Sequence, residues 1–369
     1  MKNEWIYEKL DDVCSVDYGT RVVQKKDKGS KYYVYGGGGA TFMVDTYNRE
    51  DCFVVARFAM SPKCTRFVSG KFFLNDSGLS VSTKSTKLLQ SFVNKVLLAN
   101  NDTIYNMGKG MAQKNLDMPS FRNLDIPVPP LQEQERIVAE LDLLTGIIDK
   151  QKQQLKELDT LAQSIFYDMF GNPVENDKGW EKKQIGKICT SKKQIQRASK
   201  RFKDSDIIRY IDISSIDNIN NVMTSTTSYG FGDAPSRAQQ VVEIGDVLIS
   251  LVRPNLNNVA MVSEDGTDLV ASSGFCVLRA NCEIVKEFLF YSVKMKCFTD
   301  YLMQRVSGAN YPAVREDDIM GYNIILPPLE LQESFAQKIQ SIESQKKSIN
   351  RSIAESQKLF DYTMDKYFG

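Results

Sequence analysis

The sequence contains no histidine in its 369 residues. Without histidine the chain cannot form a Ser-His or Cys-His nucleophile pair, lacks the usual neutral general base, and cannot build a zinc site from imidazole ligands. The seven cysteines form no CxxC pair, so their pattern is typical neither of a disulfide framework nor of a metal cluster. We expect free thiols, no metal and no catalytic residues in this chain.

Long hydrophobic runs are also missing. No apolar stretch approaches the roughly 20 residues that span a bilayer, and the opening segment MKNEWIYEKLDDV lacks the apolar core of a signal peptide. We therefore expect a cytoplasmic protein with no membrane partner. The chain is long enough for two domains of ordinary size, each with its own core.

The most informative feature that the sequence does have is a repeat. The segment PPLQEQERIV begins at Pro129, and PPLELQESFA begins 198 residues later at Pro327. Upstream, WIYEKLDDVC at 5–14 is similar to WEKKQIGKIC at 180–189, with a shift of 175 residues. Repetition of this kind predicts duplicated modules that share their ends and differ in their middles.

Each PPL segment begins a long helical pattern, in which residues spaced alternately by three and four positions form a coiled-coil seam. The second copy of the seam is more polar than the first. The predicted interface residues are Ile137, Leu141, Leu144, Ile148, Leu155, Phe335, Ile339, Ile342, Ile349 and Ile353. We expect an antiparallel coiled coil with a pseudo-twofold axis; the alternative is that each helix docks on a separate protein.

The remaining segments predict two mixed α/β domains, in an α/β (α+β) fold class. Strands are expected at 52–58, 65–74, 209–214, 246–252, 258–262 and 274–280, and shorter helices at 88–99 and 283–303. The expected order is a first domain at 1–128, a spacer helix at 129–171, a second domain at 172–326 and a C-terminal spacer helix at 327–369.

Polar and basic loop residues are the candidates for function. Arginine pairs well with guanine edges and Asn or Gln with adenine, while lysine more often holds phosphates. The segment 181–209 is strongly basic and 210–268 is acidic, a charge separation suited to binding a polyanion. The candidate DNA-binding residues are Arg57, Lys63, Arg66, Lys192, Lys193, Gln194, Gln196, Arg197, Arg253, Asn255, Asn257 and Asn258.

The glycine run at 36–39 is a candidate for a phosphate-binding loop. No GK[ST] follows it, and no clear strand–turn–helix context surrounds it, so a turn or flexible loop is the favoured interpretation.

In motif order and in duplication, the sequence resembles the specificity subunits of type I restriction-modification systems. The resemblance is carried by IPVPPLQEQERIV and IILPPLELQESFA, by KYYVYGGGGAT, GDVLISLVRPN and SSGFCVLRA, and by the two start segments at 5–14 and 180–189. It implies two target-recognition domains, separated by two conserved helices, that bind a split and asymmetric double-stranded DNA target.

The resemblance also implies that this chain has neither catalytic activity nor a cofactor. AdoMet and ATP would be bound by partners only: two methyltransferase subunits and, where present, restriction motor-nuclease subunits. Two other hypotheses stay open. One is a duplicated protein-interaction scaffold, which predicts no salt-dependent DNA affinity. The other is a specificity subunit of a methyltransferase that lacks a nuclease.

Overall fold

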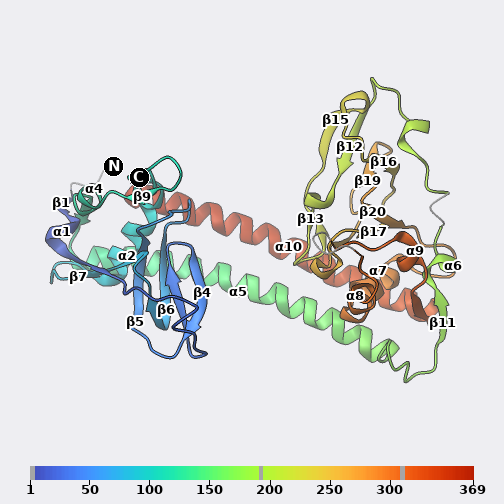
Figure 1. Cartoon of the computed structure of the whole chain (residues 1–369), viewed down its shortest axis with the longest axis horizontal. Helices are drawn as coiled ribbons and strands as arrows, with labels where there is room; N and C mark the ends of the chain where they lie inside the picture. Colours follow the sequence, from blue (N-terminus) through green and yellow to red (C-terminus); the bar gives the residue numbers. More distant parts are fainter. Residues whose placement is uncertain (1–4, 191–193, 308–311) are drawn as a thin grey trace. The chain divides into compact units, whose positions relative to one another are not determined.

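The structure is a computed structural model that describes residues 5–190, 194–307 and 312–369 (Figure 1). The chain divides into two compact units, Met1–Gln153 with Asn350–Gly369, and Gln154–Ile349. Each unit therefore contains a sheet-bearing domain together with a part of both long helices.

The two long helices, α5 (Leu131–Phe170) and α10 (Leu329–Phe368), have 40 residues each. Each begins directly after a Pro-Pro pair, which suits the start of a helix because proline lacks the N–H that the first turn leaves unbonded. At 1.5 Å per residue each helix is about 60 Å long. Gly171 ends α5 with a φ of +76°, the left-handed conformation that favours glycine.

The repeated ends of the sequence fold into the same frame in both domains. In the first, β1 (Ile6–Lys9) pairs antiparallel with β10 (Asp125–Val128), and Ile6 lies opposite Val128. In the second, β11 (Glu181–Gln184) pairs with β21 (Asn323–Leu326). The register is the same once the shifts of 175 and 198 are applied.

Short helices complete the frame. A one-turn helix follows the first strand of each pair, and another short helix precedes the second strand. They are α1 (Leu10–Val13) and α4 (Met118–Arg122) in the first domain, and α6 (Ile185–Ile188) and α9 (Glu316–Met320) in the second.

A buried glutamine in the first turn of each long helix joins the frame to that helix. Gln134 accepts a hydrogen bond from Leu89 N–H at 2.8 Å and donates to Pro129 O at 2.8 Å. Leu89 is the N-cap of helix α2 (Gln90–Ala99), so Gln134 binds one of the N–H groups that the start of α2 would leave without a partner.

Gln332 does the same in the second copy. It accepts from Val285 N–H at 2.9 Å and donates to Pro327 O at 2.8 Å. Val285 is the N-cap of helix α7 (Lys286–Lys294). This shared contact explains why both PPL segments carry a glutamine at the same place.

Between the parts of this frame, the first domain builds one mixed sheet of six strands, in the order β2-β7-β5-β6-β3-β4. Helix α2 covers it, and Phe53, Phe92 and Phe121 are fully buried in the shared core. The strands are β2 (Cys14–Tyr18), β3 (Tyr32–Gly36), β4 (Gly39–Val44), β5 (Arg49–Ala56), β6 (Thr65–Leu74) and β7 (Gly78–Thr83); α3 (Asn101–Asn106) and the hairpin β8 (Gly108–Lys109) and β9 (Asn115–Leu116) follow.

The second domain divides its strands between a four-stranded sheet, β15-β12-β19-β16, and a three-stranded sheet, β18-β17-β20. A two-stranded hairpin, β13-β14, is separate. The strands are β12 (Ile207–Ile211), β13 (Ile216–Asp217), β14 (Val222–Met223), β15 (Thr227–Gly230), β16 (Ala238–Val241), β17 (Val247–Ser250), β18 (Val259–Met261), β19 (Leu269–Ser272) and β20 (Phe275–Leu278).

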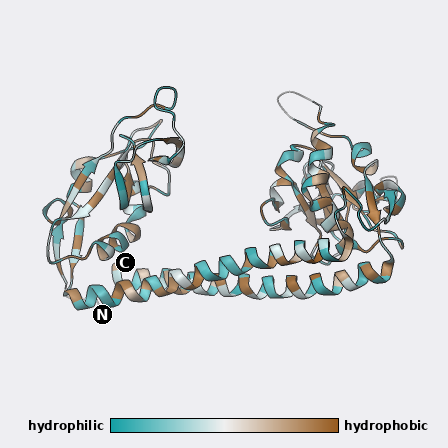
Figure 2. Ribbon diagram, turned by 90° about the horizontal axis from the view of Figure 1, so that it is seen from below, coloured by the Kyte–Doolittle hydropathy of each residue, from teal (hydrophilic) through white to brown (hydrophobic). Residues whose placement is uncertain are grey.

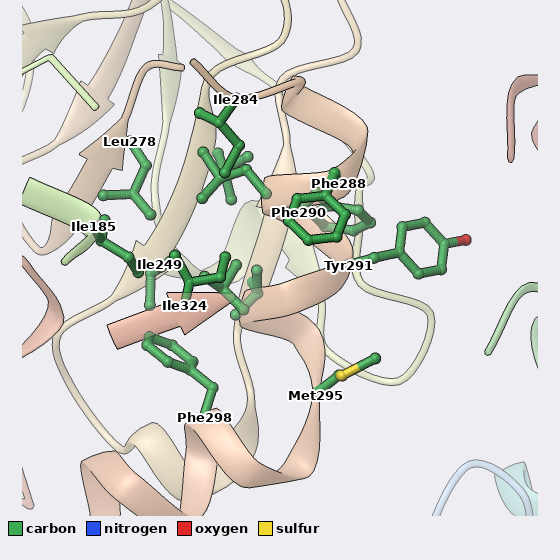
Figure 3. Packing of buried hydrophobic residues seen from close by; sticks show 14 of the residues in the cluster. Ile185, Ile249, Leu278, Ile284, Phe288, Phe290, Tyr291, Met295, Phe298 and Ile324 are labelled. Carbon is green, nitrogen blue, oxygen red and sulfur yellow. The ribbon is translucent and has the colours of Figure 1, made fainter. Parts of the chain in front are cut away.

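The helix predicted at 283–303 is in fact two helices, α7 and α8 (Lys296–Met303). Met295 between them is extended, with φ −69° and ψ 150°. The break lets Phe288 and Phe298, one from each helix, enter the same buried cluster around Ile249 and Ile324 (Figure 3). A continuous apolar periodicity cannot reveal such a break, because no proline or glycine marks it.

Within each unit the long helices pack antiparallel. In the first unit, Ile137 and Leu141 near the start of α5 share a core with Tyr367 near the end of α10. In the second unit, Phe166 near the end of α5 meets Phe335 near the start of α10, with ring centroids 5.6 Å apart. Along both helices apolar residues recur at intervals among polar ones, as a coiled-coil seam requires (Figure 2).

Candidate nucleic-acid interface

Two of the three segments predicted to contact DNA, the loops after β5 and β17, occupy equivalent places in the two domains. In the first, Leu116 N–H donates to Arg57 O at 2.9 Å, and Met60 N–H donates to Lys114 O at 2.9 Å. These bonds fix the loop after β5 to the segment that leads into α4.

The second domain repeats the arrangement. Val314 N–H donates to Leu251 O at 2.9 Å, and Arg253 N–H donates to Pro312 O at 2.7 Å. Val314 and Pro312 are the residues that follow Leu116 and Lys114 by 198 positions. The loop after β17 is therefore held to the segment before α9, just as the loop after β5 is held to the segment before α4.

In the first loop, Arg57 is half-buried and lies against two aromatic rings. Its guanidinium carbon lies 4.7 Å from the ring centroid of Tyr18 and 4.3 Å from that of Phe58. Both rings are themselves partly exposed. These two rings restrain the guanidinium, and no described residue forms a hydrogen bond or ion pair with its N–H groups.

Arg66, at the start of β6, has a different role. Its guanidinium donates to Gly37 O at 3.1 Å and to Lys63 O at 2.9 Å, so it joins the loop to the glycine run. That run is the turn of the β3–β4 hairpin, where Gly36 pairs with Gly39. Arg66 therefore stabilises the loop, whereas the exposed side chain of Lys63 remains a candidate for phosphate contact.

In the second domain, three of the predicted residues meet at an open hollow of about 790 Å³. Its lining residues are Gln194, Ile195, Gln196, Arg197, Lys200, Gln239, Gln240 and Ser273. Arg197 and Gln239 also line an adjoining hollow of about 280 Å³. The hollow offers amide, guanidinium and ammonium groups, which suit base edges and phosphates.

Lys192 and Lys193 lie outside the described residues. Gln239, on a strand some 40 positions away from the predicted segment, could not have been found from local sequence. Lys200 belongs to that segment, but only the structure shows that it shares the hollow.

The loop at 253–258 is tied into its own domain. Arg253 and Asn257 both adopt left-handed backbone conformations with φ of +50°. The Asn257 amide donates to Lys294 O at 3.2 Å, and Asn258 is buried. The chain thus uses Asn257 to build the loop, while Arg253 and Asn255 are exposed. Among the described residues that line the hollow, none comes from this loop.

The basic segment 181–209 is partly neutralised by acids from elsewhere. Lys183 forms an ion pair with Glu283 at 2.7 Å, which raises the pKa of the Lys183 ammonium. Arg209 pairs with Asp268 at 2.8 Å and with Glu264. Positive charge for a polyanion is therefore concentrated on fewer residues than the sequence suggests, with Arg197 and Lys200 at the hollow.

The predicted seam residues of the long helices are all buried or half-buried. Ile137, Leu141, Leu144, Ile148, Phe335, Ile339 and Ile342 are buried, and Leu155, Ile349 and Ile353 are half-buried. Polar residues also lie in the seam, Gln151 and Lys346 among them. Gln151 donates to Ser352 Oγ at 2.7 Å, and Lys346 pairs with Asp159 at 2.9 Å.

The charge of Lys346 is retained despite its position in the seam. Burial lowers the pKa of its ammonium, but Glu343 at 3.0 Å and Asp159 outweigh burial, and the net shift is upward. The second helix therefore replaces an apolar seam residue with a buried lysine whose two carboxylate partners stay partly exposed. The pairing of Lys346 allows the more polar second helix to pack in the seam.

Among the described residues, no group of three Cys, Asp or Glu side chains converges as a metal site would require. No described helix is long and apolar enough to cross a membrane.

Residues 2–160 and 177–356 match the family described as Type I restriction modification DNA specificity domain. The chain belongs to this family. The matched segments cover most of the sequence and fall one on each copy of the repeat. The type I specificity subunit is thus built from two copies of one family domain, as its shared frame shows.

Relatives agree with this assignment. The specificity subunit of the type I restriction enzyme MjaVIII of Methanocaldococcus jannaschii is 26% identical over 304 residues, which cover 75% of this chain and 70% of the relative. The type I restriction-modification S subunit of M. genitalium has a similar fold, with a TM-score of 0.60 at 14% identity, over 100% of this chain and 98% of that one.

A second solved chain, from work on complex assembly and conformational transition of the type I R-M system, has a TM-score of 0.51. It is 19% identical and covers 99% of this specificity subunit and 97% of the solved chain. At these identities the two structures support the fold, with two sheet-rich domains and two long helices.

Proposed function

We propose that this specificity subunit reads a split, asymmetric double-stranded DNA target, with one half-site bound by each domain. It has no catalytic activity of its own. Methyl transfer with AdoMet, and any ATP-driven cleavage, belong to methyltransferase and motor-nuclease partners, and the complex acts in the cytoplasm.

One observation carries this proposal. The loops after β5 and β17 are held to matching segments of the two domains by matching backbone hydrogen bonds, yet the sheets that carry them differ. The equivalent placement of the two loops supports the same task, DNA binding, in both domains. The different sheets that carry the loops support different DNA sequences as the targets of the two domains.

The long helices are the proposed spacer and docking element. A rigid helix pair would fix the gap between the half-sites, because it would set the distance between the two readers along the duplex. Two methyltransferase subunits would each need a docking surface, and the repeat offers two. Leu161 and Leu359 are 198 residues apart and are 48% and 52% exposed. Leu131 and Leu329 form a second exposed pair.

The repeated acids Glu135 and Glu333 support the same idea. Both are exposed, and neither makes a hydrogen bond or ion pair with the part of the chain that the structure describes. The neighbouring glutamines, Gln134 and Gln332, are repeated because they join the long helices to their domains. The acids have no such role and remain available to partners. Charged groups at the rim of an interface affect association rate more than affinity.

The test is salt-dependent DNA binding by the subunit assembled with its methyltransferase. We expect tight binding to a duplex with both half-sites, much weaker binding with either alone, and a steep fall as salt rises. A complex that assembles but shows no salt-dependent affinity for any duplex would favour a protein-interaction scaffold instead.

A further inference from the structure

Arg57 differs from the other arginines of its loop and sheet in how it is held. Arg49 donates to Ser80 Oγ at 2.8 Å and to Asn48 O at 2.8 Å, and Arg66 donates to two backbone carbonyls. Within residues 5–190, 194–307 and 312–369, the guanidinium of Arg57 has no hydrogen bond or ion pair; its central carbon lies over the rings of Tyr18 and Phe58.

The backbone under Arg57 is fixed from several sides. Arg57 N–H donates to Ser77 O at 2.8 Å, and Leu116 N–H donates to Arg57 O at 2.9 Å. Ser77 also accepts from Gly37 N–H through its Oγ at 3.4 Å. A Cβ at Gly36 would lie only 2.3 Å from the same Oγ, so glycine is needed for this close approach. The loop, the glycine turn and the β6–β7 turn thus form one rigid support.

A guanidinium that lies over two aromatic rings and keeps its N–H groups unbonded is prepared for one kind of ligand. It presents two parallel N–H donors in a fixed plane, and these match two acceptors that lie in one plane. Guanine offers O6 and N7 in this arrangement in the major groove. A phosphate contact needs charge more than a fixed plane, and exposed Lys63 nearby can supply that.

We propose that Arg57 donates two hydrogen bonds to O6 and N7 of a guanine in the half-site of the first domain. Tyr18 and Phe58 are positioning residues that hold the plane of the guanidinium. This inference rests on the proposed function and adds to it one residue, one base and the means by which the residue is oriented.

The first experiment compares methylation motifs for the wild-type complex, Arg57→Lys and Lys63→Ala, read at single-base resolution in cells. The half-site of the first domain is the half that survives when 172–326 are replaced by a foreign domain. We expect Arg57→Lys to relax one G·C position in that half and to leave the other half unchanged, because lysine keeps the charge but loses the planar pair of donors.

Lys63→Ala is the contrast variant. It should weaken binding to all sequences evenly and reduce the slope of log affinity against log salt by about 1, without relaxing any position. If Arg57→Lys instead leaves the motif intact, or if Arg57→Ala weakens all sequences evenly with a reduced salt slope, then Arg57 is a phosphate contact and the inference is wrong.

The second experiment leaves the protein intact and changes the base. Replacement of that guanine by 7-deazaguanine removes the N7 acceptor and should lower the affinity of the wild-type complex several-fold, within the roughly 5- to 150-fold expected for losing a whole bidentate pair. The same replacement should have little further effect on Arg57→Lys. Equal effects on both proteins would overturn the inference.

The positioning role of Tyr18 and Phe58 is tested separately, by substitutions that remove or keep their rings. Tyr18→Leu and Phe58→Leu should reduce discrimination at the same base pair, whereas Tyr18→Phe, which keeps the ring, should not.

A wild-type complex with no guanine in the first half-site would refute the Arg57 inference but not the proposed function. A wild-type complex with no split motif at all would refute the proposed function itself.

Discussion

In the first domain six strands form one mixed sheet, whereas in the second domain seven strands are divided between two sheets. The strand pairs that begin and end the two domains nevertheless have the same register, and the same buried glutamine clamps each long helix to its domain. The parts that join a domain to a helix are thus the same, and the parts between them differ. These joints are alike because each of them must pack against a helix of the same length and direction.

The largest effect expected from this comparison is a change of one half-site. If the joints are interchangeable, replacing 172–326 by the second domain of another specificity subunit should give a wholly new sequence in one half of the motif. The other half and the gap should be unchanged, as read from methylation of genomic DNA. A change in both halves would show that the two domains are not independent readers.

A change of gap without a change of sequence is the next largest effect. Seven residues inserted in α5 after Gln153, with seven inserted in α10 before Asn350, would keep the seam in phase and lengthen both helices by about 10 Å. We expect the gap in the methylated motif to grow by about 3 bp, because B-DNA rises 3.4 Å per base pair.

Insertion in α5 alone is the control for the spacer experiment. It would shift one seam against the other, so it should impair folding or assembly instead of lengthening the gap. An unchanged gap in a double insertion that assembles normally would contradict the role of the helices as a spacer.

The equivalence of the joints can be tested through stability. Gln134→Ala and Gln332→Ala each leave a helix N-cap N–H and a proline carbonyl without a buried partner, so each should cost about 2–4 kcal/mol in the free energy of unfolding. Chemical denaturation of the full chain measures this cost. The equally repeated but exposed acids are the matched controls: Glu135→Ala and Glu333→Ala should change stability by less than about 0.5 kcal/mol. Similar losses for glutamine and glutamate variants would contradict the clamp.

The smallest effect concerns the polar seam. Lys346→Met removes the buried ammonium, but Asp159 and Glu343 are 37% and 43% exposed and can regain water, so stability should change by no more than about 1 kcal/mol near neutral pH. Exposed Lys347→Met is the control.

The pH dependence of that variant has a definite sign. The folded-state pKa of Lys346 is above its ordinary value of 10.5, so any stability that the ion pair contributes is complete below this pH and is lost as pH rises through the folded-state pKa. The difference between wild type and Lys346→Met should therefore shrink in alkali. A loss of several kcal/mol at neutral pH would instead mean that the seam depends on this ion pair.

Much of the fold could be predicted from sequence because its signals are local. The seam repeat predicts both long helices to within a few residues, and alternation with β-branched residues predicts β6 at 65–74. The break at Met295 was missed, since what decides it is the burial of two phenylalanines and not any local breaker.

The candidate interface was less accessible to sequence reasoning. The guanidinium of Arg57 is distinguished by Tyr18, almost 40 residues earlier, and the hollow at Gln194 is completed by Gln239. Contacts of this range depend on which strands become neighbours. The repeated glutamine was equally inaccessible, because the repeated acids Glu135 and Glu333 stand next to it and are exposed, so repetition alone does not distinguish a buried polar residue from an exposed one.

The measurement that tests the account most directly is the genomic methylation pattern of cells that express this specificity subunit with its methyltransferase, read at single-base resolution with and without the subunit. The account predicts a split, asymmetric motif with a fixed gap, which disappears when the subunit is deleted. A methylation pattern that persists unchanged without the subunit, while the complex is shown to assemble when it is present, would contradict its role as the reader of the sequence.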